Sequence, residues 1–202
     1  MKERKKSLLL SLTKEEINSA LRKIEKSLDT YIWLQNNLHK CDVSEDKIYQ
    51  RKFTGFYKIR RDKAWLEKFY DLLQVKKKFK NTTFSLMLFI LFARFYKNGK
   101  LLKKIEASFA SKFVATINPH LPIIDKYVLK NIGLRLPASY EGTKLQRLNK
   151  TIVLYEEISK IYSEFLASKD GKYLIAQFKK KYPNKKISKV KMLDFVLWQI
   201  RN

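Results

Sequence analysis

Residues 107–128 read ASFASKFVATINPHLPIIDKYV, and this stretch says more about the fold than any other part of the chain. Its first half mixes small and apolar side chains, which predicts a helix that another backbone can approach closely; we expect that helix to span residues 101–118. Pro119 and Pro122 force the chain out of helix, because proline lacks the amide hydrogen and clashes with the preceding turn. Asp125 stands where a helix N-cap belongs. The stretch therefore predicts a helix, an irregular loop and a second, short helix.

Apolar residues recur at helical intervals on both sides of this unit. Thr13 and Glu16 form a capping box, and the pattern behind them predicts one long amphipathic helix that continues to Leu38. Residues 84–96 are apolar almost all round, which predicts a buried central helix. About 13 residues are too few for the roughly 20 that a membrane-spanning helix needs. The other expected helices lie at about 44–57 with an interruption near Gly55, 62–80, 145–165 with a break at Asp170 and Gly171, 173–183 and 188–200.

These patterns predict an all-α fold. The 202 residues form a compact helical domain, in which an N-terminal helical lobe of about 1–80 can be distinguished from a core of about 84–202. With 5 glycines, 4 prolines and 45% hydrophobic residues, the composition argues against both disorder and a turn-rich β-sandwich. We find no internal repeat and no low-complexity linker, so a single domain over 1–202 is expected.

The charge of the chain indicates its partner. Lysine and arginine number 44 against 19 aspartates and glutamates, for a formal net charge of +25. Such a field attracts polyanions, and neutralising phosphates releases counterions, so DNA is the expected partner and RNA the next. An anionic membrane also attracts cations, but no membrane partner is expected; a protein partner remains open. The alternative is that part of the charge is only a solvated, lysine-rich surface.

Cysteine and histidine usage limits the remaining classes. Cys41 is the only cysteine, which excludes an intrachain disulfide and a thiolate zinc site. His39 and His120 are isolated and lack the spacing of metal ligands, so neither a metal nor a cofactor is expected. The apolar run at 7–12 is too short for a signal peptide, and no cleavage site follows it. We therefore expect a cytoplasmic protein.

The segments Ala107–Lys112, Ile117–Pro119 and Pro122–Val128 resemble the catalytic segment of helix-hairpin-helix DNA glycosylases, in particular their 8-oxoguanine branch. In that superfamily a helix of small residues leads through a proline-containing loop to an aspartate that caps the next helix and faces the excised nucleotide. The resemblance gives this place to Asp125. It covers about residues 104–135 and implies the all-helical fold of that superfamily and the removal of a modified base.

Two features depart from the family pattern. The stretch 103–106 has none of the glycines that the family places in its hairpin. The amine nucleophile of the bifunctional members falls on or near Ala107 or Ser108, where no lysine stands. Lys112, one helical turn further on, is the substitute that the chain offers; the alternative is a solvated lysine. This abbreviated form also resembles small proteins of the same fold that accompany bacterial nucleotide-signalling antiphage operons.

Asp125 suits the role on physical grounds. A carboxylate at a helix N-terminus is kept ionised by backbone N–H groups and the helix dipole. It can activate water or stabilise an oxocarbenium-like sugar as the base departs. The alternative is that Asp125 only caps a helix after a proline loop.

The stretch from Arg51 to Arg61 interleaves cations with aromatic rings, as surfaces that track a nucleic-acid backbone do. The alternative is a helix corner whose rings belong to the core and whose cations are solvated. A second basic cluster lies between Lys179 and Lys191. The residues expected to bind nucleic acid are Arg51, Lys52, Lys58, Arg60, Arg61, Lys103, Lys104, Lys126 and Lys130.

The sequence therefore predicts a nucleic-acid-binding protein that resembles 8-oxoguanine-type DNA N-glycosylases, with Asp125 as catalytic carboxylate and Lys112 as the nucleophile of any lyase step. The alternative is a catalytically inactive DNA- or RNA-binding or adaptor subunit that keeps the fold. A scaffold for a partner protein is the third reading. Because the hairpin lacks glycine amides, lysines have to grip the phosphate backbone, which predicts strongly salt-dependent binding.

Overall fold

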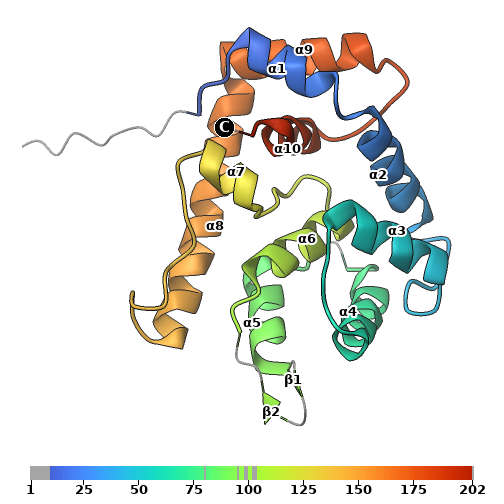
Figure 1. The fold of residues 1–202 in the computed structure, drawn as a ribbon, viewed down its shortest axis with the longest axis vertical. Coiled ribbons are helices and arrows are strands. Elements are labelled where there is room, and N and C mark those ends of the chain that lie inside the picture. Colours follow the sequence, from blue (N-terminus) through green and yellow to red (C-terminus); the bar gives the residue numbers. More distant parts are fainter. Residues whose placement is uncertain (1–9, 80, 95, 98–99, 102–103, 202) are drawn as a thin grey trace, which may run out of the picture.

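The computed structural model describes residues 10–79, 81–94, 96–97, 100–101 and 104–201. This part of the chain is almost wholly helical, as predicted (Figure 1). Its ten helices are α1 (Lys14–Leu21), α2 (Glu25–Asn37), α3 (Lys47–Tyr57), α4 (Lys63–Lys76), α5 (Phe84–Arg94), α6 (Ala107–Ile117), α7 (Lys126–Asn131), α8 (Lys144–Ala167), α9 (Lys169–Lys181) and α10 (Lys189–Gln199). Two short strands, β1 (Tyr96–Lys97) and β2 (Lys100–Leu101), pair antiparallel between α5 and α6.

Helix α10 is the central element of the core. It packs against α1, α7, α8 and α9, and its residues 191–197 are all buried. Helix α1 lies beside α9, so the first helix and the last but one form one layer (Figure 1). One cluster of buried apolar side chains includes residues of every helix. None of the described helices is both long enough and apolar enough to cross a bilayer.

The prediction of a single long helix over residues 13–38 is wrong, because the chain forms two helices, α1 and α2, with a turn at 22–24 between them. The capping box of Thr13 and Glu16 is present as predicted. No glycine or proline marks the turn. It lets α1 pack against α9 and α10 while α2 packs against α3, and Ile24 is fully buried within it. Tertiary packing has thus overridden a continuous helical periodicity.

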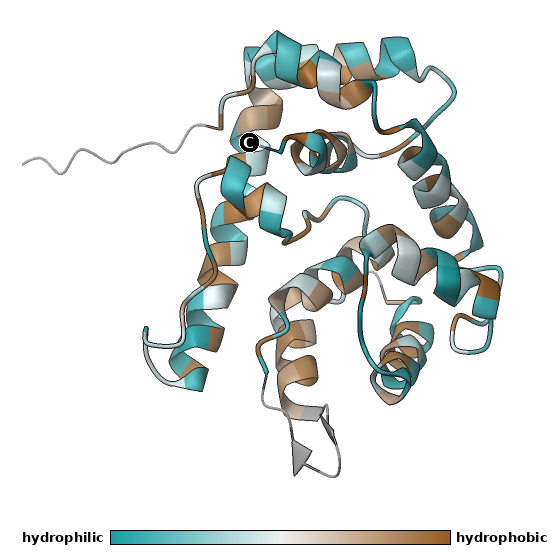
Figure 2. Cartoon of the chain, in the orientation of Figure 1, coloured by the Kyte–Doolittle hydropathy of each residue, from teal (hydrophilic) through white to brown (hydrophobic). Residues whose placement is uncertain are grey.

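The centre of the chain also differs from the expectation. Helix α5 begins after Thr83, whose hydroxyl accepts a hydrogen bond from the Leu86 amide. Figure 2 shows this helix as apolar along its length, yet it is not buried all round, because Leu86 and Phe89 are 43% and 54% exposed. The helix expected from residue 101 begins only at Ala107, since the chain first turns back through the β1–β2 hairpin.

The two glycines expected as interruptions lie inside helices. Helix α3 runs through Gly55, where an added Cβ would meet nothing within 4 Å. Gly171 lies within α9, and the break falls earlier, at Ser168, which caps α9. A Cβ on Gly171 would lie 2.0 Å from the Phe165 carbonyl oxygen, so the turn from α8 into α9 needs glycine there. Leu145, expected to face the core at the start of α8, is exposed.

Candidate functional site

The loop between α6 and α7 is held by side chains from distant parts of the sequence. Three of its carbonyl oxygens accept hydrogen bonds: Pro119 O from Ser188, Leu121 O from Lys191 (3.0 Å) and Pro122 O from Tyr155 (2.9 Å). Its next two amides donate, Ile123 N to Asp194 (3.4 Å) and Ile124 N to Ser111 (2.8 Å). Each bond satisfies a backbone group that burial would otherwise leave unpaired. The loop therefore has a fixed path, and that path sets the position of Asp125.

Two of these bonds depend on a buried ion pair within α10. Lys191 Nζ lies 2.5 Å from Asp194 Oδ2, and the two side chains are 4% and 5% exposed. Asp194 Oδ1 also accepts from the Tyr162 hydroxyl at 2.7 Å. Burial raises the pKa of Asp194, and the Lys191 ammonium is the first of the groups that oppose this rise. The pair ties α10 to the loop and to α8.

Asp125 caps α7 as predicted. Its Oδ1 accepts a hydrogen bond from the Tyr127 amide at 2.9 Å, and the residue is only partly buried. The cap holds the carboxylate in one orientation at the end of the anchored loop. A carboxylate fixed in this way can stabilise a positive charge that develops beside it.

Lys112 lies inside the protein on α6, with only 8% of its surface exposed. Its Nζ donates to the Tyr57 carbonyl oxygen at 3.4 Å and lies 6.0 Å from the ring centre of Phe109. Burial lowers the pKa of Lys112, and the negative charge of Asp125 opposes that change. The reading of Lys112 as a solvated lysine is therefore wrong. The fold places its amine within electrostatic range of Asp125.

This arrangement favours nucleophilic chemistry at Lys112. At a given pH an amine with a lowered pKa has a larger unprotonated fraction than an exposed lysine, and only the unprotonated amine attacks carbon. A neighbouring carboxylate stabilises the cation that such an attack produces. The pair can support formation of a Schiff base with a carbonyl carbon.

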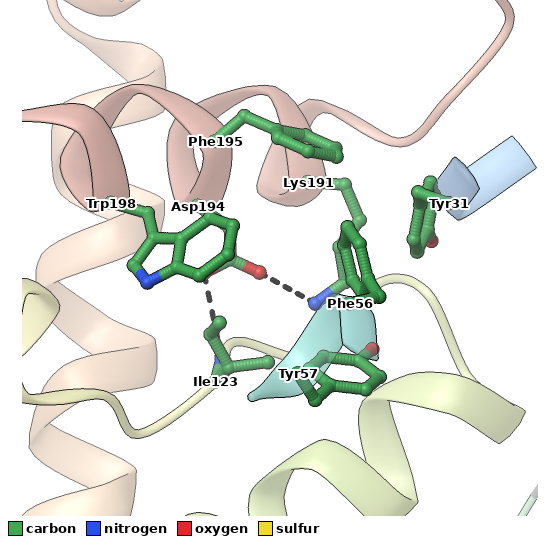
Figure 3. Close-up of a pocket in the computed structure, with 8 residues that line it drawn as sticks. All are labelled: Tyr31, Phe56, Tyr57, Ile123, Lys191, Asp194, Phe195 and Trp198. Atoms are coloured by element: carbon green, nitrogen blue, oxygen red, sulfur yellow. Dashed lines mark hydrogen bonds and ion pairs between the residues drawn. The ribbon is translucent and has the colours of Figure 1, made fainter. Parts of the chain in front are cut away.

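A small pocket lies where α2 and α3 meet α10 and the anchored loop (Figure 3). Its lining consists of five aromatic side chains, one aliphatic side chain and the buried ion pair: Tyr31, Phe56, Tyr57, Phe195, Trp198, Ile123, Lys191 and Asp194. A volume of about 20 Å³ gives room for about one water molecule. Tyr57 contacts the Lys112 amine and also lines the pocket, so the two features are adjacent.

The predicted nucleic-acid-binding residues have different environments. Most of them are exposed: Arg51, Lys52, Lys58, Arg60, Lys104, Lys126 and Lys130. Lys103 lies outside the described residues. Arg61 is paired, because its guanidinium lies 2.7 Å from Glu106 and 4.7 Å from the ring centre of Phe109. It joins the α3–α4 connection to the start of α6. In the second basic cluster Lys191 is buried.

Lys58 follows Tyr57 of the pocket lining and has an uncommon backbone conformation. Among the described residues it is the only one besides glycine with a positive φ, at 51°. It closes α3 at a position where glycine is commonest. Its ammonium lies 5.3 Å from the ring centre of Trp198. On the outer face of α3, Lys52 makes the same kind of contact with Trp33 at 5.0 Å.

This pair of lysines provides a matched test of the strain at Lys58. Lys58→Gly is expected to leave a protein about 2 kcal/mol more stable than Lys52→Gly does, because each change loses one cation–π contact, the first relieves left-handed strain, and the second places glycine inside α3. Urea unfolding of both variants measures the difference. A difference no larger than the roughly 1 kcal/mol that glycine costs inside a helix would show that the αL backbone at Lys58 carries no strain.

The sequence interpretation missed four residues of this region: Tyr57, Glu106, Lys191 and Asp194. A local signal existed for the last two. They stand three residues apart in a helix whose other inner positions are apolar, so both charges had to be buried together or exposed together. Tyr57 and Glu106 had no such signal, because their roles come from contacts with Lys112 and Arg61.

Comparison with known proteins assigns no family. No protein-family model, no curated protein and no solved structure matches the chain. Within the described residues no group of three or more histidine, cysteine, aspartate and glutamate side chains could hold a metal ion. The Lys112–Asp125 pair and its surroundings are therefore the candidate functional site.

Proposed function

We propose that this protein binds DNA and removes a modified base from it, with Lys112 and Asp125 as the reacting pair. The observation that carries the proposal is the buried amine of Lys112, whose pKa is lowered by burial within range of the Asp125 carboxylate. Burying a charged amine costs free energy unless it is paired, and Lys112, unlike Lys191, makes no ion pair among the described residues. The resemblance of residues 104–135 to DNA glycosylases points to the same chemistry.

The reaction would begin with the neutral Lys112 amine attacking C1′ of the target nucleotide. As the N–C1′ bond forms, the glycosidic bond breaks, and the base leaves with its electron pair and takes up the proton that the amine loses. Opening of the sugar ring gives a Schiff base at C1′, which water hydrolyses to an abasic site. Throughout, the Asp125 carboxylate stabilises the positive charge on the sugar and on the imine.

The surroundings of the pair suit a nucleic-acid substrate. A net charge of +25 supplies the attraction to phosphate, and Lys58 and Lys126 are exposed cations next to the pocket and next to Asp125. A base that undergoes chemistry has to leave the stack and enter a pocket lined by rings. The pocket of Figure 3 is lined by such rings, and one of them belongs to Tyr57, whose carbonyl oxygen accepts a hydrogen bond from Lys112.

Release of bases from duplexes that carry 8-oxoguanine, uracil or alkylated bases tests the proposal. Wild-type protein is expected to produce abasic sites, and Asp125→Asn is expected to slow this by about 10²-fold or more, because the amide lacks the charge. Asparagine still caps a helix, so the fold is kept. Asp62→Asn, an exposed N-cap of α4 outside the reacting pair, is the control and should release bases at the wild-type rate.

The second candidate function is a DNA- or RNA-binding or adaptor subunit without catalysis. The observation that favours it is the size of the pocket, about 20 Å³, which does not admit a base without movement of the lining side chains. This function predicts a strongly salt-dependent affinity, no base release on any duplex, and equal binding by wild type and Asp125→Asn. That set of results would reject the glycosylase proposal.

A further inference from the structure

The hydroxyl of Tyr31 is buried without a hydrogen-bond partner among the described residues. Tyr31 extends from α2, is 2% exposed, and lines the aromatic pocket (Figure 3). It also lines a wider surface groove of about 410 Å³, formed with Gln35, His120 and Lys186 among others. Leaving a hydroxyl unpaired in the interior costs free energy that a phenylalanine at this position would not.

The remaining polar groups of the pocket are mostly donors. A lysine ammonium has three N–H groups; two of those of Lys191 are used, by the Leu121 carbonyl oxygen and by Asp194 Oδ2. Asp194 accepts three hydrogen bonds in all, from Lys191, Tyr162 and the Ile123 amide, of about four that a carboxylate can take. The pocket therefore offers at least two donors, among them the Tyr31 O–H and one Lys191 N–H, against about one acceptor on Asp194.

Burial keeps the Tyr31 hydroxyl protonated. It raises the pKa of that group, and Tyr57 and the charge of Asp194 raise it further. The hydroxyl is therefore able to donate at any pH at which the protein would work.

We propose that the Tyr31 hydroxyl reads the base, by donating a hydrogen bond to a keto oxygen of a base held in the aromatic pocket. This inference rests on the proposed function for the position of the base and adds the chemical class that is recognised: bases with a carbonyl group at the edge they present to Tyr31. The second donor, on Lys191, favours the same class. A base with hydrogen at that position would leave both donors unpaired.

Entry of the base requires the pocket to widen from its volume of about 20 Å³. Phe56 and Trp198 are its partly exposed rings, and their ring centres lie 6.0 Å apart. Tyr31, Tyr57 and Phe195 are buried. The two mouth residues are therefore the ones that move outward and then stack on the base, while Tyr31 stays in place.

The test compares pairs of duplexes that differ at one keto group, hypoxanthine with unsubstituted purine and 8-oxoadenine with adenine, each opposite the same abasic position. Equilibrium binding is measured in the Asp125→Asn protein, so that base release does not consume the DNA. The keto duplex is expected to bind about tenfold or more tightly than its partner. Tyr31→Phe is expected to reduce that preference by about tenfold, the usual value of one hydrogen bond, with affinity for the keto-free duplex unchanged.

Tyr49→Phe is the matched control, because the Tyr49 hydroxyl is also buried and unpaired within the described chain but does not line the pocket. Both variants are expected to keep or raise the wild-type Tm, since neither hydroxyl has a partner to lose. Three outcomes would each overturn the inference. The Asp125→Asn protein with both tyrosines intact could show no preference for keto duplexes, the preference could survive Tyr31→Phe, or Tyr49→Phe could reduce it as much as Tyr31→Phe does. A Tyr31-dependent preference without base release by wild type would reject only the glycosylase proposal.

Discussion

Replacing Lys112 with methionine is expected to abolish covalent capture of DNA and, at the same time, to make the protein more stable. Borohydride reduces a Schiff base to a stable amine, so a protein–DNA adduct reports the reaction of the Lys112 amine directly. Methionine fills a similar volume without an amine. Because the variant no longer buries an ammonium that is 8% exposed, its free energy of unfolding should rise by about 1 kcal/mol.

The pH dependence of this stability difference has a definite sign. Burial lowers the pKa of Lys112 below its ordinary 10.5. Between the lowered value and 10.5 the unfolded chain binds more protons than the folded protein, so wild-type stability rises with pH across that window. The advantage of Lys112→Met is therefore largest at neutral pH and shrinks toward pH 10.5. The rate of adduct formation should rise with pH until the amine is unprotonated.

An exposed lysine beside the site provides the control for both measurements. Lys126→Met removes a cation next to Asp125, and this lysine is exposed in the wild-type protein. The change should therefore weaken DNA binding without preventing covalent capture, and it should not raise the free energy of unfolding. If Lys112→Met forms the borohydride-reduced adduct in the same yield as wild type, an amine other than Lys112 forms it. A Lys112→Met protein that is less stable than wild type would show that the hydrogen bond to the Tyr57 carbonyl outweighs the cost of burying the charge.

Removing the carboxylate of Asp194 is expected to be the most destabilising single change in this region. Asp194→Ala leaves the Lys191 ammonium buried without its partner and removes the acceptor of the Tyr162 hydroxyl and the Ile123 amide. Breaking one side of a buried pair typically costs about 3 to 5 kcal/mol. Urea unfolding measures the loss, and faster hydrogen exchange at the Ile123 amide should locate it in the loop before Asp125.

The double variant Lys191→Met with Asp194→Leu separates the charge from the packing. Replacing a buried ion pair by apolar side chains of similar volume is often close to neutral, so the double variant should recover much of the stability that Asp194→Ala loses. It should not recover protection of the Ile123 amide, whose acceptor is still missing. A loss below about 1 kcal/mol in Asp194→Ala would mean that the pair does not hold the loop.

Local sequence signals were reliable where a single helix end or turn carried the information. The caps at Thr13 and Asp125 are formed as predicted, and Asp62 and Ser188 cap the helices expected to begin there, because an N-cap bonds to amides two or three residues away. The proline loop before Asp125 is likewise local. Signals that depend on packing were less reliable: residues 22–24 break a helix without glycine or proline, and Gly55 breaks nothing.

Some features of the candidate site also follow from short segments of sequence, whereas others depend on contacts between distant residues. The sequence alone was sufficient for an all-helical fold, for the +25 charge and for Asp125 as a helix cap, since composition, periodicity and capping are properties of short segments. The burial of Lys112, the pairing of Arg61 with Glu106 and the anchoring of the loop by Lys191 and Asp194 join residues 45 to 70 positions apart or more. Only the packed chain brings these groups together, and burial among neighbours from other helices is what changes the chemistry of an ordinary lysine.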